Sequence, residues 1–365
     1  MSRSNPEYEI ISDLGELMAI GPHWDRLADN FPTPLLSHAW FTSAAAALHP
    51  DDQIHVVLKK SAGEVCGVAP MVKRRRHGFR SLEVIGSDIL REPAGLLYKT
   101  PGDLRDILDH LAGYRLPLYF DTLADPVLVA ELSVIRGVAS APGSREGVSG
   151  SPWVRIDRSW QEYYEGLDSS WRSARRRAHK KADAAGKVDF EFISPDPDCL
   201  DRLMEEFILV EGRGWKGRLG TALANTIRGR GFFKLYGREA AGKGILRLAF
   251  MRIDGAPVAA HFAVECHRRY WLLKIGYDEK WSPCSPGILL MYAALERAFD
   301  LRLEAFEFLG RNEPWIRIWK HKLHTYHQRS VDQVPARRMA TRAIATCGKI
   351  HQRIRTKLAR RSTGG

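Results

Sequence analysis

The stretch Trp-Ser-Pro-Cys-Ser-Pro-Gly-Ile-Leu-Leu at 281–290 has the composition of an anion-binding helix start. Ser285 is a favourable helix cap, and Pro286 suits the first helical position. Gly287 then lets a ligand approach the backbone N–H groups of the first turn, which includes Ile288. Such N–H groups carry partial positive charge and can bind a phosphate or pyrophosphate. The same residues also make an ordinary helix start, so the pattern alone leaves both interpretations open.

The segment before this junction, residues 268–277, has the pattern of an apolar strand with one charge inside it. That charge is Lys274, which needs a counter-charge or an anionic ligand if it is buried, although it could also lie on a solvated face. Gly276 predicts either a bulge or the close approach of another backbone. We therefore expect Lys274 and Gly276 to lie beside the same anionic ligand as the helix start.

The elements that must position these residues follow one another in the second half of the chain. Alternating apolar residues predict strands over 245–253, 258–266 and 268–277. A helix over 286–300 and a strand over 303–309 follow. This order is an antiparallel meander and then one crossover helix, so the end of the third strand and the start of the helix must be neighbours.

The whole chain has the composition of a folded protein with two domains. Its 365 residues are 44% hydrophobic and 27% charged, which supplies a core and excludes a disordered chain. Residues 1–150 show a looser series of short strands and helices. A Gly/Pro/Ser-rich connector at 142–152 then separates the two halves.

Several classes of protein are not expected from this sequence. No apolar run approaches the roughly 18 residues of a membrane span, and the first nine residues lack the apolar stretch of a signal peptide. The five cysteines are scattered and form no CxxC pair, so we expect neither a zinc site nor disulfides. A reducing cytoplasm is the expected location.

Positive charge is concentrated in two segments. Nine of the twelve net charges lie in residues 336–365, which contain no acidic residue, and this leaves +3 for the rest. The spacing of apolar residues in this tail predicts a basic amphipathic helix, suited to an anionic membrane surface, a partner or its own domain. The basic helix at 171–181 could hold phosphates of a ligand or be a solvated face.

The stretch 245–320 resembles the GNAT N-acyltransferase superfamily, in particular the branch that contains FemAB-like proteins. The pattern consists of Gly255-Ala-Pro-Val-Ala-Ala, Lys274-Ile-Gly-Tyr-Asp-Glu, Ser285-Pro-Gly-Ile-Leu-Leu and Glu307-Phe-Leu-Gly-Arg-Asn-Glu-Pro-Trp. Upstream, Glu211-Gly-Arg-Gly-Trp-Lys-Gly is similar to a segment of the same branch. The usual Arg/Gln-x-x-Gly-x-Gly/Ala phosphate loop of the superfamily is replaced here by the sequence that precedes Ile288.

This resemblance implies an α/β (α+β) fold of two tandem GNAT-like domains, each a mixed, mostly antiparallel sheet flanked by helices. Residues 1–150 would be a degenerate first domain, 151–335 the acyltransferase domain, and 336–365 the basic tail. The implied co-substrate is acyl-CoA, with acetyl-CoA as the first expectation and no metal. The acceptor would be a small-molecule amine, and the tail could place the protein at the inner face of the membrane.

An amine that attacks a thioester needs a base for its proton, donors for the oxyanion and a proton for the leaving group. The candidate bases are Glu211, His261 and Glu307, and Tyr277 is the candidate acid. His261 and Tyr277 are also the kind of residue that packs in a core. Backbone near Gly276 or Tyr277 would supply the oxyanion donor.

The expected acceptor-binding residues come from neighbouring motifs and are Trp215, Lys216, Asp278 and Glu307. Asp278 could instead be only a turn residue. Cys284 is not expected to be a nucleophile, because GNAT-type transfer is direct.

Three functions compete at this point. The first is an acyl-CoA-dependent N-acyltransferase that acts on an amino acid, amino sugar or similar amine. The second is an aminoacyl-tRNA-dependent transferase that acts on a cell-wall precursor, which the FemAB-like resemblance allows. The third is a GNAT scaffold without catalysis. FemAB-like proteins that use tRNA usually carry an added helical hairpin, and no long heptad segment is found here, which favours the first function over the second.

Overall fold

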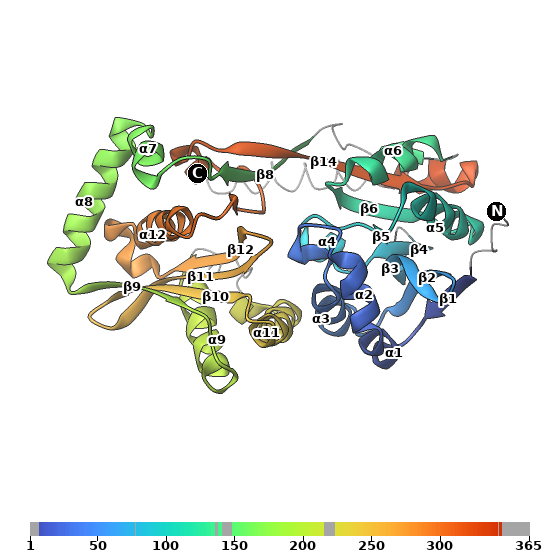
Figure 1. Cartoon of the computed structure of the whole chain (residues 1–365), viewed down its shortest axis with the longest axis horizontal. Coiled ribbons are helices and arrows are strands. Elements are labelled where there is room, and N and C mark those ends of the chain that lie inside the picture. The colour runs from blue at the N-terminus through green and yellow to red at the C-terminus, as the bar shows by residue number, and fades with distance from the viewer. Residues whose placement is uncertain are drawn as a thin grey trace, which may run out of the picture. The chain divides into compact units, whose positions relative to one another are not determined.

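The computed structural model describes residues 7–76, 78–135, 138–140, 148–214, 223–341 and 343–344. Contacts within the chain divide it into two compact units (Figure 1). Unit 1 contains Met1–Phe31, Asp51–Val148 and Tyr326–Gly365, and unit 2 contains Pro32–Pro50 and Ser149–Thr325. Each unit has a mixed, mainly antiparallel sheet with helices packed on it, so the predicted α/β (α+β) fold class is confirmed.

The sheet of unit 1 has the strand order β1-β2-β3-β4-β6-β14, and its neighbours are antiparallel except for the parallel pair β4 and β6. A two-residue turn at Ala62-Gly63, both with positive φ, joins β2 to β3 as in a tight hairpin. The strands are β1 (Glu7–Ile11), β2 (Gln53–Ser61), β3 (Glu64–Arg76), β4 (Phe79–Val84), β5 (Leu97–Tyr98), β6 (Leu118–Leu123), β7 (Val138–Ser140) and β14 (Lys322–Val331). The helices are α1 (Leu14–Ala19), α2 (Gly21–Ala28), α4 (Ser87–Leu90), α5 (Pro101–Gly113) and α6 (Pro126–Val134).

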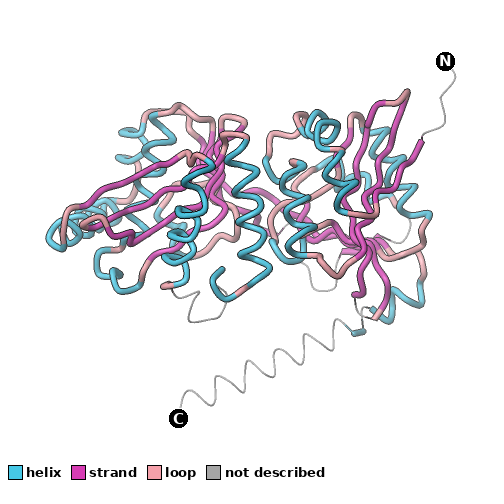
Figure 2. The backbone as a smooth tube through the Cα atoms, turned by 90° about the horizontal axis from the view of Figure 1, so that it is seen from below, coloured by secondary structure: helices cyan, strands magenta, loops and turns pink. Residues whose placement is uncertain are grey.

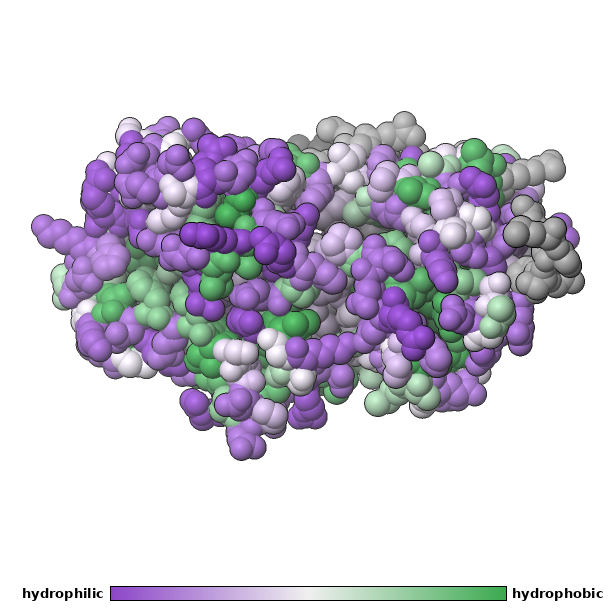
Figure 3. All heavy atoms as spheres, viewed as in Figure 1, coloured by the Kyte–Doolittle hydropathy of each residue, from purple (hydrophilic) through white to green (hydrophobic). Residues whose placement is uncertain are grey.

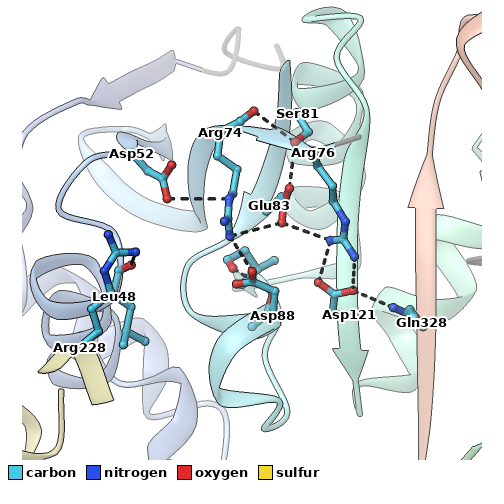
Figure 4. A network of polar contacts seen from close by, with 12 residues as sticks. Leu48, Asp52, Arg74, Arg76, Ser81, Glu83, Asp88, Asp121, Arg228 and Gln328 are labelled. Atoms are coloured by element: carbon cyan, nitrogen blue, oxygen red, sulfur yellow. Dashed lines mark hydrogen bonds and ion pairs between the residues drawn. The ribbon is translucent and has the colours of Figure 1, made fainter. Parts of the chain in front are cut away.

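A network of ion pairs joins the strands of unit 1 (Figure 4). Arg76 of β3 bonds Glu83 of β4 at 3.2 Å and Asp121 of β6 at 3.1 Å. Arg74 bonds Asp88 at 2.6 Å and lies 3.9 Å from Glu83. Since Glu83 is only 2% exposed, its charge needs these guanidinium partners for the unit to be stable.

The sheet of unit 2 has the strand order β8-β13-β12-β11-β10-β9, with β12 and β13 as its parallel pair. The predicted meander is confirmed as β10, β11 and β12, and α12 is the predicted crossover helix. The strands are β8 (Val148–Arg155), β9 (Val188–Ile193), β10 (Leu246–Ile253), β11 (Ala256–Cys266), β12 (Arg269–Tyr277) and β13 (Ala305–Glu307). The helices are α3 (His38–Leu48), α7 (Trp160–Glu165), α8 (Ser169–Ala185), α9 (Pro197–Gly212), α11 (Ile227–Gly242) and α12 (Pro286–Asp300), with 3-10 turns η1 (Pro34–Leu36), η2 (Leu223–Asn225), η3 (Glu279–Cys284) and η4 (Pro314–Ile318).

Helices cover both faces of the unit 2 sheet (Figure 2). On one face, Phe262 of β11 packs against Phe207 of α9 and Phe233 of α11. On the other face, Ala263 of β11 belongs to one buried cluster with Met291 of α12. Side chains alternate between the faces of a strand, so these contacts fix which residues of the sheet face α9 and α11 and which face α12.

Two segments depart from the predicted division of the chain. Residues 32–50 belong to unit 2, because Trp40 of α3 packs edge-on against Phe232 and Tyr236 of α11. Residues 326–335 belong to unit 1, where the second part of β14 pairs with β6. The strand predicted over 303–309 is shorter and covers Ala305–Glu307.

The predicted tail lies mostly outside the described residues. Its first turn is helical, and Arg337 there bonds Asp332 at 2.8 Å and the carbonyl of Arg115 at 2.6 Å. No helix in the described part of the chain is long and apolar enough to cross a membrane.

Candidate functional site

The parallel strands β12 and β13 of unit 2 separate after a short pairing, and we call this feature the β12/β13 fork. They pair only from Arg269 and Ala305 to Trp271 and Glu307. Beyond that point β12 runs on to Tyr277, paired with β11, whereas the N–H of Phe308 bonds the carbonyl of Pro152 on the β8 side. Leu309 and Gly310 then have φ values of 54° and 59°, which end the extended conformation. The two strands therefore diverge at their carboxyl ends.

A bulge on β12 lies just inside the fork. Phe262 of β11 pairs with Lys274, and Ala263 pairs with Leu272, so Leu273 has no residue opposite it on β11. The bulge predicted near Gly276 is therefore displaced to Leu273. A bulge re-aims backbone groups locally.

The start of α12 lies at the open end of the fork. A Cβ added to Gly287 would lie 3.3 Å from Cδ1 of Tyr277, so the first turn of the helix packs directly on the end of β12. Ser285 has a left-handed backbone, with φ of 48°, and makes no side-chain cap. Its carbonyl accepts the N–H groups of Ile288 and Leu289. The first turn is therefore not closed by a capping side chain, unlike that of a helix with a conventional cap residue.

Glu211, near the end of α9, packs closely against the backbone of β12. A Cβ at Gly276 would lie 2.4 Å from the Cα of Glu211, so the close backbone approach expected at this glycine is present. Glu211 is 1% exposed, and its Oε2 accepts the N–H of Leu223 at 2.8 Å. Its Oε1 lies 3.7 Å from Nζ of Lys274 and has no hydrogen-bond partner among the described atoms.

Lys274 has the counter-charge that a half-buried lysine requires. Its ammonium lies 5.6 Å from the ring centre of Phe233, on the sheet face that α9 and α11 cover. Lys274 and Glu211 therefore share this face.

His261 lies on the opposite face of the sheet. Its neighbours two residues away on β11, Ala259 and Ala263, both pack in clusters with residues of α12. His261 is 1% exposed, and burial lowers its pKa to about 3. The structure therefore does not bring His261 together with Glu211 and Lys274, and the imidazole is uncharged at neutral pH.

Glu307 lies at the point where the fork begins and is bound by a guanidinium and an imidazole. It is fully buried, with Oε1 2.6 Å from Nη1 of Arg269 and Oε2 2.8 Å from Nε2 of His324. The His324 ring stacks on Trp153 with a centroid distance of 5.5 Å and an interplanar angle of 17°. Trp153 pairs with Glu307, and Lys322 lies over the Trp153 ring.

Sequence reasoning named Glu307 and missed His324, Arg269 and Trp153. These residues come from three distant segments, and only sheet pairing makes them neighbours. The one signal in the sequence was Glu307 itself, an acidic residue within a short apolar strand.

The remaining candidates have simpler surroundings. Asp278 accepts the N–H of Lys280 at 3.0 Å and lies 3.5 Å from Arg213, so it holds the η3 turn in place. Trp215 and Lys216 lie outside the described residues. No group of three or more His, Cys, Asp or Glu that could hold a metal ion occurs in the described ranges.

The sequence matches the model of the acetyltransferase (GNAT) domain over residues 169–317, which include β12, α12 and β13. In fold, the chain is similar to the crystal structure of FemX, with a TM-score of 0.61 and 14% identity over 92% of this chain and 100% of that one. A tandem GNAT protein from the clavulanic acid biosynthesis pathway gives a TM-score of 0.51 and 14% identity over 90% and 99%.

A third structure is the C-terminal domain of a putative lysylphosphatidylglycerol synthetase from Agrobacterium fabrum, with a TM-score of 0.53 and 12% identity over 91% and 95% of the two chains. A comparison with curated proteins gives no match.

These findings place a GNAT acetyltransferase domain in unit 2 and support an acyltransferase. The chain has the tandem GNAT fold that FemX shares, so the predicted resemblance to GNAT and FemAB-like acyltransferases is confirmed.

Proposed function

We propose that the protein transfers an acyl group from a thioester carrier, with acyl-CoA as the donor, to the primary amine of a small molecule or sugar. The observation that carries this proposal is the β12/β13 fork with the first turn of α12 at its open end. From Trp271 to Tyr277 the strand rises by about 20 Å, at roughly 3.3 Å per residue. An extended phosphopantetheine arm can span this length.

Different residues of the fork would bind different parts of the carrier along that length. The N–H of Gly287 would hold the phosphate at the open end, because Pro286 has no N–H to give and the N–H of Ile288 already bonds the carbonyl of Ser285. Backbone beside the Leu273 bulge would face the thioester oxygen, and Lys274 would balance negative charge. Tyr277 is proposed as a wall of the carrier site, because its ring contacts the start of α12.

The acceptor is proposed to bind on the sheet face that α9 and α11 cover. Glu211, Lys274 and Glu307 supply charge there, and Trp215 and Lys216 follow α9 directly in the chain. A carboxylate-lined site suits an ammonium group, and buried carboxylates bind one only if their charges are compensated when it leaves. Lys274 and Arg269 supply that compensation.

An aminoacyl-tRNA donor is the second candidate, and α8 is the observation that favours it. Arg175 docks this helix on α12 by bonding Glu296 at 3.4 Å, while Arg176, Arg177, Lys180 and Lys181 stay exposed. The surface over α7 and α8 is mainly hydrophilic (Figure 3). A row of exposed cations can contact a phosphate backbone, with an affinity that falls steeply with salt.

The test uses the full chain with a panel of acyl-CoAs, a library of primary amines and detection of thiol release. Gly287→Asp should raise the apparent dissociation constant of the carrier at least tenfold, because it places bulk and negative charge at the proposed phosphate position. Gly287→Ala is the matched control and should change it less than threefold. An enzyme that binds no acyl-CoA but transfers an acyl group from a charged tRNA would replace the first candidate by the second. A protein inactive with both donors would contradict the proposal.

A further inference from the structure

We propose that the closed end of the β12/β13 fork, where the two strands are still paired, binds a carboxylate of the acceptor, so that the acceptor is an amine of the amino-acid class. This inference rests on the proposed acyl transfer and names the substrate class of that site. The observation that carries it is the indole N–H of Trp271, which is buried and has no hydrogen-bond partner among the described residues. Because an unpaired buried donor costs stability, a donor at this place is explained by a ligand whose oxygen pairs with it.

Trp271 and Glu307 lie on the sheet face opposite α12. Their preceding neighbours, Tyr270 and Phe306, stack on each other with ring centres 4.8 Å apart, in the cluster that contains residues of α12. Successive side chains of a strand alternate between the faces, so Trp271 and Glu307 belong to the other face, where they are register partners. Trp153 is the partner of Glu307 on β8 and completes a row of three side chains across the closed end.

Arg269 lies beside this row. It precedes Trp271 by two residues on β12, so both side chains share one face. Its Nη1 lies 2.6 Å from Oε1 of the fully buried Glu307, which holds the guanidinium in place. The Arg269 side chain is 27% exposed, so a ligand can reach its other N–H groups. A guanidinium binds a planar carboxylate through charge-assisted hydrogen bonds, and the indole N–H of Trp271 supplies a further donor.

The charged groups that contact Glu307 and Trp153 also favour an anion. Lys322 is exposed, with Nζ 5.4 Å from the ring centre of Trp153, and it has no ion pair with a described residue. Arg269 and Lys322 are two cations, whereas Glu307 is one carboxylate, so the net charge is positive. His324, the second partner of Glu307, adds no negative charge whether or not it is protonated. A simple amine or an amino sugar offers no group that pairs with this charge, whereas an amino acid does.

The location can bring the amino group of such a molecule to the proposed thioester. The bulge at Leu273 lies two residues beyond Trp271, or about 7 Å along the strand. A carboxylate held by Arg269 and Trp271 therefore leaves an amino group a few bonds away within reach of the bulge, where the carbonyl would lie. The ion pair of Lys274 and Glu211 follows on the same face.

The test measures kcat/KM of the full chain for a panel of amino acids, each paired with the amine that lacks only its carboxyl group, with acyl-CoA as donor and thiol release as the readout. The ratio of the two values is compared between variants, because the basicity of each amine cancels from a change in that ratio. Trp271→Phe keeps an aromatic ring but removes the donor, and it should lower the ratio by about 10–100-fold. Lys322→Gln should lower it by about two- to fivefold, because this charge is exposed.

Arg269→Lys keeps the charge but loses the planar set of donors, and it should lower the ratio by about tenfold. Arg268→Lys is the matched control, because Arg268 precedes Arg269 and bonds Glu304 at 3.0 Å. Its ratio should stay at the wild-type value. Melting temperatures show whether each variant is folded, and if Trp271→Phe unfolds, the exposed Lys322→Gln decides.

Unchanged ratios in the folded Trp271→Phe and Lys322→Gln variants would overturn the inference. A wild-type enzyme that acylates simple amines or amino sugars but no amino acid would overturn it too, while the proposed acyl transfer would stand. A wild-type enzyme that binds acyl-CoA but acylates no amine would overturn the proposed function, and this inference with it.

Discussion

The pH dependence of folding can decide whether His261 is a core residue or a base. Burial lowers the pKa of His261 from 6.5 to about 3, because the charged ring would lose its hydration. In the unfolded chain the same ring binds a proton below about pH 6.5. Its contribution to stability is therefore fully present above pH 6.5 and is lost as the pH falls toward 3. At pH 5 the loss corresponds to 1.5 pKa units, or about 2 kcal/mol.

The variant His261→Leu removes this titration and keeps a similar volume. The free energy of unfolding is measured in urea at pH 7.5 and pH 5.0, and the loss between the two should be about 2 kcal/mol smaller in the variant than in the wild type. Comparing the two pH values cancels any constant cost of the substitution. His55, whose pKa burial lowers to about 4, contributes equally to both proteins.

The exposed residue His23 provides the control, since His23→Leu should lose as much stability as the wild type between the two pH values. His261→Leu should also retain acyl transfer at pH 7.5. An equal loss of stability in His261→Leu and the wild type would mean that the folded protein can protonate this ring, and the assignment of His261 to the core would be wrong.

Three further outcomes are expected. Gly276→Ala should lower the free energy of unfolding by about 1–3 kcal/mol, because its Cβ would lie 2.4 Å from the α9 backbone. Gly242→Ala is the control and should not lower the free energy of unfolding, because its Cβ would have no atom within 4 Å. Equal melting temperatures of the two variants would refute this prediction. Arg76→Met should cost about 2–3 kcal/mol by leaving Glu83 without its closest cation, while the folded variant still transfers acyl groups; unchanged stability in urea would show that the network is dispensable. Deletion of 342–365 should reduce binding to anionic vesicles at low salt without changing turnover of a soluble amine, and unchanged vesicle binding would exclude the tail as a membrane contact.

The sequence predicted the parts of this protein that depend on local pattern. Alternating apolar residues marked β10, β11 and β12, and the Pro-Gly pair marked the start of α12. Gly276 was correctly associated with a close backbone approach, because a glycine inside an apolar strand often marks the place where a second backbone segment comes near.

The parts that failed depend on which face of the sheet a residue occupies. His261 and Glu211 were expected to share one site, yet the alternation of β11 directs His261 to the face that α12 covers, whereas Glu211 lies on α9, which covers the other face. Sequence cannot show the register between strands, and one residue of register moves every side chain to the other face. His324 was missed for a related reason, since its partner Glu307 is 17 residues away and reaches it only through the sheet.

Each unit has one parallel strand pair, but the charged residues at the two pairs have different partners. In unit 1 the parallel pair β4 and β6 is joined just past its pairing by Arg76, which bonds carboxylates of both strands. In unit 2 a buried carboxylate of the parallel pair, Glu307, bonds Arg269 and a partly exposed imidazole.

The N-termini of the helices that follow these strands also differ between the two units. The strand β4 is followed by the four-residue helix α4, and the longer α5 closes its first N–H groups with the Thr100 and Asp103 capping box. That carboxylate opposes the binding of an anion there. The helix α12 follows β12 with no side-chain cap and no acidic residue in its first turn. Among the described residues, unit 2 is thus where a separated parallel strand pair is followed by a helix with no side-chain cap. The match to the GNAT domain lies in the same unit. We infer that unit 1 keeps the fold without a carrier site of its own, and that a chain should bind one carrier and not two.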